Sequence, residues 1–250
     1  LSESEEENDI SLGIRVFTGT SSAIVSGNDL SDAALKRLSE TALQMAHHTP
    51  GDKETMPAEA ALLEPFQENE ETALDLYDPA DLLDQNRLNE TVARLEARGL
   101  SHPDITKSDG AAASHAHTHT VLMLGRDYAA SRMRSHFSTS LMLIAGEGEA
   151  MERDYAYDTV VHHADSKTTD QIADLAANRT RARLNPKPGK TGTFPVMIDR
   201  RVAGSILRHF ARAINGGAIL RKTSFLGERL GQTIFNPSIS IMDDPLRKRG

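Results

Sequence analysis

Residues 111–124 read Ala-Ala-Ala-Ser-His-Ala-His-Thr-His-Thr-Val-Leu-Met-Leu, and residues 131–145 read Ser-Arg-Met-Arg-Ser-His-Phe-Ser-Thr-Ser-Leu-Met-Leu-Ile-Ala. Both stretches, and 151–157 after them, follow the two-residue period of a strand. Turn sequences separate the three, Gly-Arg-Asp at 125–127 and Gly-Glu-Gly at 146–148. The pattern therefore predicts an antiparallel meander of three long strands.

Shorter elements are expected on either side of the meander. A hairpin is predicted over 10–18 and 21–26, followed by a helix to about His47, capped within 28–31. Residues 49–79 form a proline-rich, acidic connector, and Pro79 opens a second helix that ends at Gly99. Together these elements predict an α+β fold, beginning with an N-terminal α/β domain of helices packed on antiparallel sheet.

A break rich in proline and glycine near 186–192 predicts a domain boundary. A third helix precedes it, from about Ser166 to Leu184, capped by Asp165 or Ser166. After the break we expect a short buried strand, Phe194–Ile198, and a helix over 200–214. The domains are accordingly predicted as 1–188 and 189–250, the second being the beginning of a β-rich C-terminal domain.

Composition excludes several classes of protein. The 250 residues include no cysteine, which rules out disulfides and thiolate metal sites and is typical of a reducing compartment. No apolar run approaches the ~18 residues that span a bilayer. We therefore expect a cytoplasmic protein with no membrane partner. The chain begins at Leu1 and ends after a basic run, so we expect a longer protein from which both ends are missing.

Charge is distributed unevenly, with a net −14 on residues 1–100 and +6 on residues 101–250. A positive half can indicate a nucleic-acid surface. Its bases are scattered and few aromatic residues lie among them, so solvated helix faces are the preferred interpretation and nucleic acid is an unexpected partner.

The densest group of possible metal ligands is His115, His117 and His119. Their spacing in a predicted strand projects all three imidazoles from one face, about 6.6–7 Å apart. Two such histidines can share a zinc ion, although a polar sheet face is the simpler interpretation. The pair His162 and His163 is interpreted as surface, because adjacent side chains diverge.

The helix over 200–214 carries His209 beside an apolar stripe that includes Phe210 and Ile214. A zincin site needs two histidines and a glutamate base, and no further His or Glu follows as far as residue 218. His209 is therefore expected to be a packed, hydrogen-bonded residue. Asn-Gly-Gly at 215–217 is expected to end the helix, and Asp-Asp-Pro at 243–245 reads as a turn at a strand end.

In combination, several short blocks make the chain resemble the TldD/PmbA family of metalloproteases, also called modulators of DNA gyrase. The blocks are Leu12-Gly-Ile-Arg-Val, Asn28-Asp-Leu-Ser-Asp-Ala-Ala-Leu, Leu76-Tyr-Asp-Pro, Ser108-Asp-Gly-Ala, Ala145-Gly-Glu-Gly-Glu-Ala-Met-Glu-Arg-Asp-Tyr155 and the region 202–245. The resemblance is to the PmbA (TldE) branch and covers essentially the whole chain.

The resemblance implies that the TldD branch binds zinc through a His-Glu-x-x-x-His helix, whose positions correspond here to His209, Phe210 and Ile214. It implies an accessory subunit with no catalytic residue and no cofactor of its own. Its partner would be a zinc-bearing TldD-like subunit in a heterodimer, or a second copy in a homodimer, and its substrates unfolded peptides. The alternatives are a self-sufficient metallopeptidase that uses His115, His117 and His119, and, third, a DNA-associated or gyrase-modulating protein.

Overall fold

The computed structural model describes residues 3–53, 56–57, 73–79, 84–126 and 128–250. The chain divides into one unit of residues 1–184 with 248–250, and a second of residues 185–247. Each unit is described by itself. In the described part of the chain, no helix combines the length and the apolar character needed to cross a membrane.

The predicted meander forms the largest element of the first unit. Strands β3 (Ile105–Leu124), β4 (Tyr128–Ala145) and β5 (Glu152–Val160) pair antiparallel in the order β3-β4-β5. At the turn after β4, Gly146 has a φ of +79°, and a Cβ there would lie 2.6 Å from the Ala150 carbonyl oxygen. Only glycine fits this position. The turn predicted at 146–148 is therefore confirmed.

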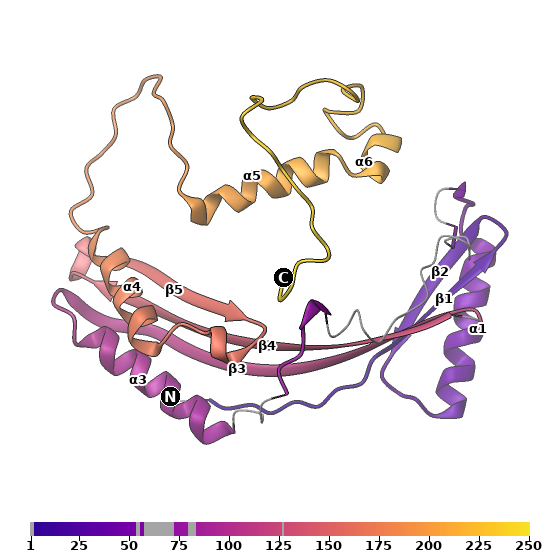
Figure 1. Cartoon of the computed structure of the whole chain (residues 1–250), viewed down its shortest axis with the longest axis horizontal. Coiled ribbons are helices and arrows are strands. Elements are labelled where there is room, and N and C mark those ends of the chain that lie inside the picture. The colour runs from indigo at the N-terminus through magenta and orange to yellow at the C-terminus, as the bar shows by residue number, and fades with distance from the viewer. Residues whose placement is uncertain (1–2, 54–55, 58–72, 80–83, 127) are drawn as a thin grey trace. The chain divides into compact units, whose positions relative to one another are not determined.

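Helices α3 (Gln85–Leu100) and α4 (Thr169–Arg181) cover one face of this sheet (Figure 1). The core between them consists of buried aliphatic side chains from both helices, β4 and β5: Leu95, Leu141, Leu143, Ala156, Ile172, Ala173, Ala176 and Ala177. Small residues make the packing close. A Cβ on Gly99 of α3 would lie 2.8 Å from Leu141 Cδ2.

A smaller layer consists of the hairpin of β1 (Leu12–Thr18) and β2 (Ser21–Gly27) with helix α1 (Asp32–His48) packed on it. Helix α1 begins after Ser31, whose hydroxyl accepts from the Ala34 N–H. These elements confirm the predicted hairpin and first helix. The α+β class is confirmed as well. The predicted start of the second helix at Pro79 is wrong, because α3 begins at Gln85 after the N-cap Asp84, whose side chain accepts from the Arg87 N–H. Most of the 49–79 connector lies outside the described residues.

The cap of α4 differs from the prediction. Thr168, and neither Asp165 nor Ser166, occupies the N-cap, and its hydroxyl accepts from the Gln171 N–H at 3.2 Å. The Gln171 side chain accepts in return from the Thr168 N–H at 2.9 Å, which completes a capping box. A 3-10 turn at His163–Asp165 precedes the helix and delays its start.

Thr168→Ala is expected to lower the free energy of unfolding by about 1 kcal/mol, because one orphan N–H of the helix loses its acceptor. Ser166→Ala, at the position that the sequence favoured, should stay within about 0.5 kcal/mol of wild type. Urea denaturation followed by circular dichroism measures both. A larger loss for Ser166→Ala than for Thr168→Ala would contradict this cap.

The second unit contains helices α5 (Arg200–Ala213) and α6 (Gly216–Leu220) and irregular chain. Two expectations are wrong here. Phe194–Ile198 forms no strand, and Val196 and Met197 are 80% and 97% exposed. The glycine pair does not end α5. Instead Asn215 caps α6, with its side-chain oxygen accepting from the N–H groups of Gly217 and Ala218.

Candidate functional site

Two of the three strand histidines are brought together. The Nε2 atoms of His115 and His117 lie 3.1 Å apart, and their ring centroids are 4.6 Å apart with the rings nearly perpendicular. Both side chains are half-buried. His119, on the same face of β3, is exposed. The structure therefore presents a histidine pair with a third histidine outside it.

The His115–His117 pair faces a segment from far away in the sequence, residues 74–78. The Ser135 N–H of β4 donates to the Leu76 carbonyl at 3.0 Å, and the Asp78 N–H donates to the Ser135 hydroxyl at 2.7 Å. Strand β5 pairs with β4 only as far as Phe137, so this segment continues along the same edge of β4. Tyr77 is thereby carried to 4.9 Å from the His117 ring, centroid to centroid.

Aromatic contacts hold the other histidine of the pair. His115 stacks on Phe137 with centroids 4.1 Å apart and planes 10° apart, and Phe137 in turn contacts His163 at 5.4 Å. Burial, and next the neighbouring His117, lower the pKa of His115 below its usual value. The Asp78 carboxylate acts in the opposite direction, and His163 adds a small lowering.

The structure corrects the interpretation of His162 as a surface residue. Its side chain is buried beside residues 74–78, where Nε2 lies 2.9 Å from the Asp75 carbonyl oxygen and 3.1 Å from its carboxylate. His163 is exposed, but its backbone N–H donates to the Asp78 carboxylate at 2.8 Å. The adjacent histidines do diverge, so only one of them reaches solvent.

Charged residues close this region on one side. Arg249 donates to Asp75 at 2.6 Å and to Asp165 at 2.7 Å. The hydrogen bond from Arg249 is the main cause that lowers the pKa of the Asp75 carboxyl. Asp75 is therefore ionised at neutral pH and serves as the shared acceptor of His162 and Arg249.

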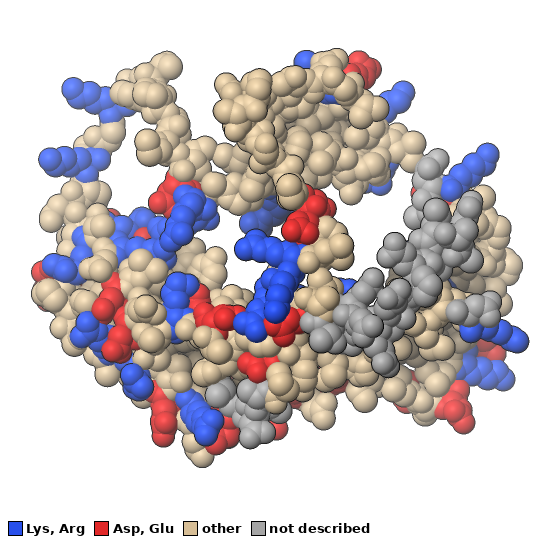
Figure 2. Space-filling model, viewed as in Figure 1, with Lys and Arg blue, Asp and Glu red and all other residues tan. Residues whose placement is uncertain are grey.

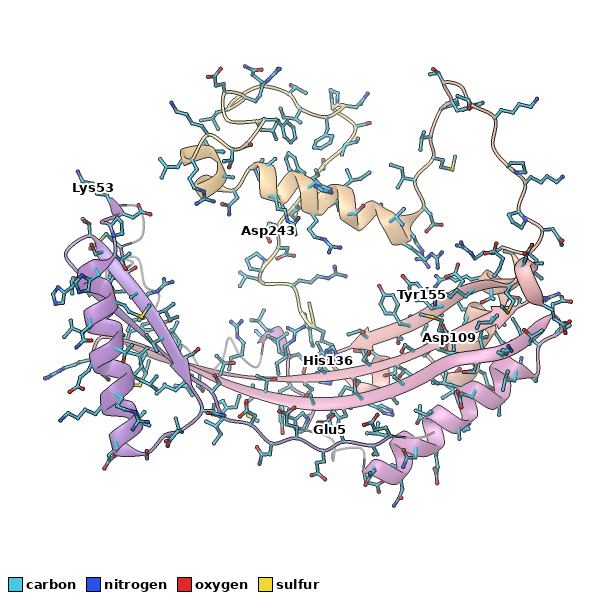
Figure 3. All side chains as sticks on the ribbon, turned by 180° about the vertical axis from the view of Figure 1, so that it is seen from behind. Glu5, Lys53, Asp109, His136, Tyr155 and Asp243 are labelled. Carbon is cyan, nitrogen blue, oxygen red and sulfur yellow. The ribbon has the colours of Figure 1, made fainter. Side chains whose placement is uncertain are left out.

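A further histidine of β4, His136, stands apart from this group. It pairs in register with Ala116, between the rungs that hold His115 and His117, so its side chain leaves the opposite face of the sheet (Figure 3). His136 is exposed. His136 therefore does not belong to the group formed by His115, His117 and the segment 74–78.

The contributions of Tyr77, Asp78 and Ser135 to this region were missed from the sequence. The available signal was Leu76-Tyr-Asp-Pro, a polar and aromatic block after an acidic connector, which by itself indicated only the family resemblance. Nothing local to that block indicates that it lies beside Ser135, more than fifty residues later.

The positions that the resemblance assigns to a zinc helix, His209, Phe210 and Ile214, lie on α5 and at its C-cap. His209 is exposed, contrary to the expectation that it packs, while Phe210 contacts Phe235 with centroids 5.0 Å apart. Ile214 follows the last residue of α5 as its C-cap. Residues five apart on a helix are separated by about 140° around its axis, so His209 and Ile214 do not share a face.

These residues do not fit a zinc ion. Phe210 and Ile214 have no donor atom, which leaves His209 as the single ligand among the three positions. Across the described ranges, no three or more His, Cys, Asp or Glu side chains are grouped to hold a metal ion. The turn predicted at Asp243-Asp244-Pro245 is present, since the Asp244 carboxylate accepts from the Leu246 N–H at 3.2 Å, but residues 239–242 before it form no strand.

Many bases of the positive second half are paired with acids in the first unit. The pairs include Arg153–Asp109 at 3.3 Å, Arg181–Asp104 at 3.2 Å and Arg183–Glu152 at 3.3 Å. Figure 2 shows the two charge signs interspersed over the region of α4 and β5. Paired charges of this kind favour solvated helix faces over a nucleic-acid surface.

Comparison with known proteins gives two family matches within the chain. Residues 1–46 match PmbA/TldA metallopeptidase domain 1, and residues 191–250 match the PmbA/TldA metallopeptidase C-terminal domain. Among solved structures, a candidate modulator of DNA gyrase from Bacteroides thetaiotaomicron superimposes with a TM-score of 0.78. It shares 19% identity with 89% of this chain, which is 50% of its own length. That likeness shows the fold.

Curated relatives are more similar in sequence. The metalloprotease PmbA homolog of Haemophilus influenzae is 32% identical over 244 residues, which are 96% of this chain and 52% of the relative. Metalloprotease PmbA of Escherichia coli O157:H7 is 30% identical over 247 residues, 98% of this chain and 54% of that protein. The chain spans about half the length of the curated relatives it matches. With both domain matches and this likeness, the chain belongs to the PmbA/TldD family.

Proposed function

We propose that this chain is a PmbA-like (TldE-like) subunit of a two-component zinc metalloprotease assembly that processes and degrades peptides. In this assembly a TldD-like partner supplies the zinc and the catalytic glutamate. The observation that carries the proposal is the chemistry of α5, where one exposed histidine is followed by Phe210 and Ile214 at the positions of the base and the second ligand. A phenyl ring cannot accept a proton from water, and an alkyl side chain cannot bind a metal.

The long sheet supports a role in holding peptide. In the described part of the first unit, β3 is the outer strand of its sheet over 20 residues, and no other strand pairs with its free side. An extended peptide can add to such an edge through main-chain hydrogen bonds, independently of most of its side chains. We place the assembly in the cytoplasm, in line with a chain that has no cysteine.

The test is a cleavage assay with a denatured protein substrate. This protein and a TldD-like subunit are each measured alone, and this protein is also measured with the TldD-like subunit and with a TldD-like variant that lacks the motif glutamate. We expect full, chelator-sensitive cleavage only when this protein is mixed with the unaltered TldD-like subunit. Cleavage by this protein alone that disappears with a chelator would overturn the proposal. The proposal would also be overturned if the TldD-like subunit alone cleaved the substrate fully and this protein did not change its rate.

A further inference from the structure

The histidine pair on β3, His115 and His117, is closer than its strand spacing requires. Side chains two residues apart on a strand start about 6.6–7 Å from each other. Here the imidazoles lean together until their Nε2 atoms are 3.1 Å apart. At this distance one Nε2–H donates to the other Nε2, and a metal ion bound by both nitrogens would replace that proton.

The pair is held from both sides. His115 lies flat on the buried ring of Phe137, and His117 is tilted against Tyr77. A pair whose rings are already fixed loses little side-chain entropy when an ion binds between them. The exposed His119 has no ring contact among the described residues and makes a natural comparison.

The spacing suits one metal ion. With metal–nitrogen bonds of ~2.0–2.1 Å, two nitrogens on neighbouring coordination positions lie about 2.9–3.4 Å apart. The 3.1 Å separation falls in this range. The Asp78 carboxylate interacts electrostatically with His115 and favours positive charge at the same place.

We propose that His115 and His117 form a two-histidine site for a divalent transition-metal ion, with Nε2 of each as ligand and water on the other positions. Imidazole ligands suit copper, nickel and zinc, and the general order of affinities places Cu²⁺ above Ni²⁺ and Zn²⁺. The site is made of first-unit residues only and uses none of the α5 positions His209, Phe210 and Ile214. It does not depend on the peptide-processing role.

The experiment is a titration of the metal-free protein with Cu²⁺, in a buffer with a weak competing chelator, for wild type and for His115→Ala, His117→Ala and His119→Ala. We expect one ion per chain in wild type and in His119→Ala. Removal of His117 or His115 should lower the affinity at least ~10-fold, since loss of a supporting residue alone costs about 10–100-fold. Equal binding by His117→Ala and His119→Ala would overturn the site.

A spectroscopic readout keeps the proposal testable if His115→Ala loses its fold together with the Phe137 stack. Electron paramagnetic resonance of the wild-type protein with one equivalent of Cu²⁺ should show two equatorial imidazole nitrogens. His119→Ala should give the same spectrum, and His117→Ala should lose one nitrogen. A wild-type spectrum without coupled nitrogens, or no saturable binding, would contradict the proposal.

Discussion

Leu141→Ala is expected to lower the free energy of unfolding by about 3–4 kcal/mol. Leu141 is fully buried in the core between β4 and the two helices, and its Cδ2 is the atom that a Cβ on Gly99 would meet first. Leu143, whose Cδ2 would lie 3.0 Å from the same Cβ, still keeps α3 from moving in to fill the space. The truncated side chain therefore leaves a cavity as well as losing its own burial.

Leu122→Ala is the matched control for Leu141→Ala. Leu122 lies on β3 near the hairpin turn and is 51% exposed, so the same truncation should change stability by no more than about 0.5 kcal/mol. Denaturant titration of both variants, with the slope held common, gives the comparison. Similar losses for the two leucines would contradict the assigned core and the packing of α3 on it.

His162→Ala has the second largest expected effect, a loss of about 2–3 kcal/mol. The buried imidazole contacts both the carbonyl and the carboxylate of Asp75. Its removal takes the side-chain partner from the carbonyl oxygen, whereas the carboxylate keeps Arg249. The change also loosens residues 74–78 from the sheet. Hydrogen exchange at Ser135, whose N–H donates to Leu76, should accelerate in this variant.

His163→Ala is the natural comparison because the two histidines are neighbours with opposite exposure. Only the exposed ring is lost, since the hydrogen bond to Asp78 comes from the backbone N–H. We expect a change of about 0.5 kcal/mol or less. If both variants were equally mild, the surface interpretation drawn from the sequence would hold and the burial of His162 would be wrong.

The meander could be predicted because its information is local. Alternation fixes which face of each strand is buried, and the glycine turns at 125 and 146 fix where the chain reverses. The same holds for α1, where Ser31 and the apolar spacing both mark the helix. Local signals of this kind agree with the tertiary structure, so they are sufficient to predict these elements.

Positions that depend on distant contacts could not be predicted. His162 is buried because the segment 74–78 lies against it, and that contact spans more than eighty residues. Asn215 followed by two glycines carries the signals of both a helix end and a helix cap, and only the backbone decides between them. Phe194–Ile198 has a strand-like sequence but no partner strand in the described unit.

The central claim is that α5 keeps the position of a zinc helix without its function, and the metal content of purified protein tests it most directly. We predict that wild type and His209→Ala, each purified alone in the presence of zinc, retain equal amounts of metal by elemental analysis. Any bound ion should instead be lost in His117→Ala. One zinc per chain that disappears in His209→Ala and persists in His117→Ala would contradict the account.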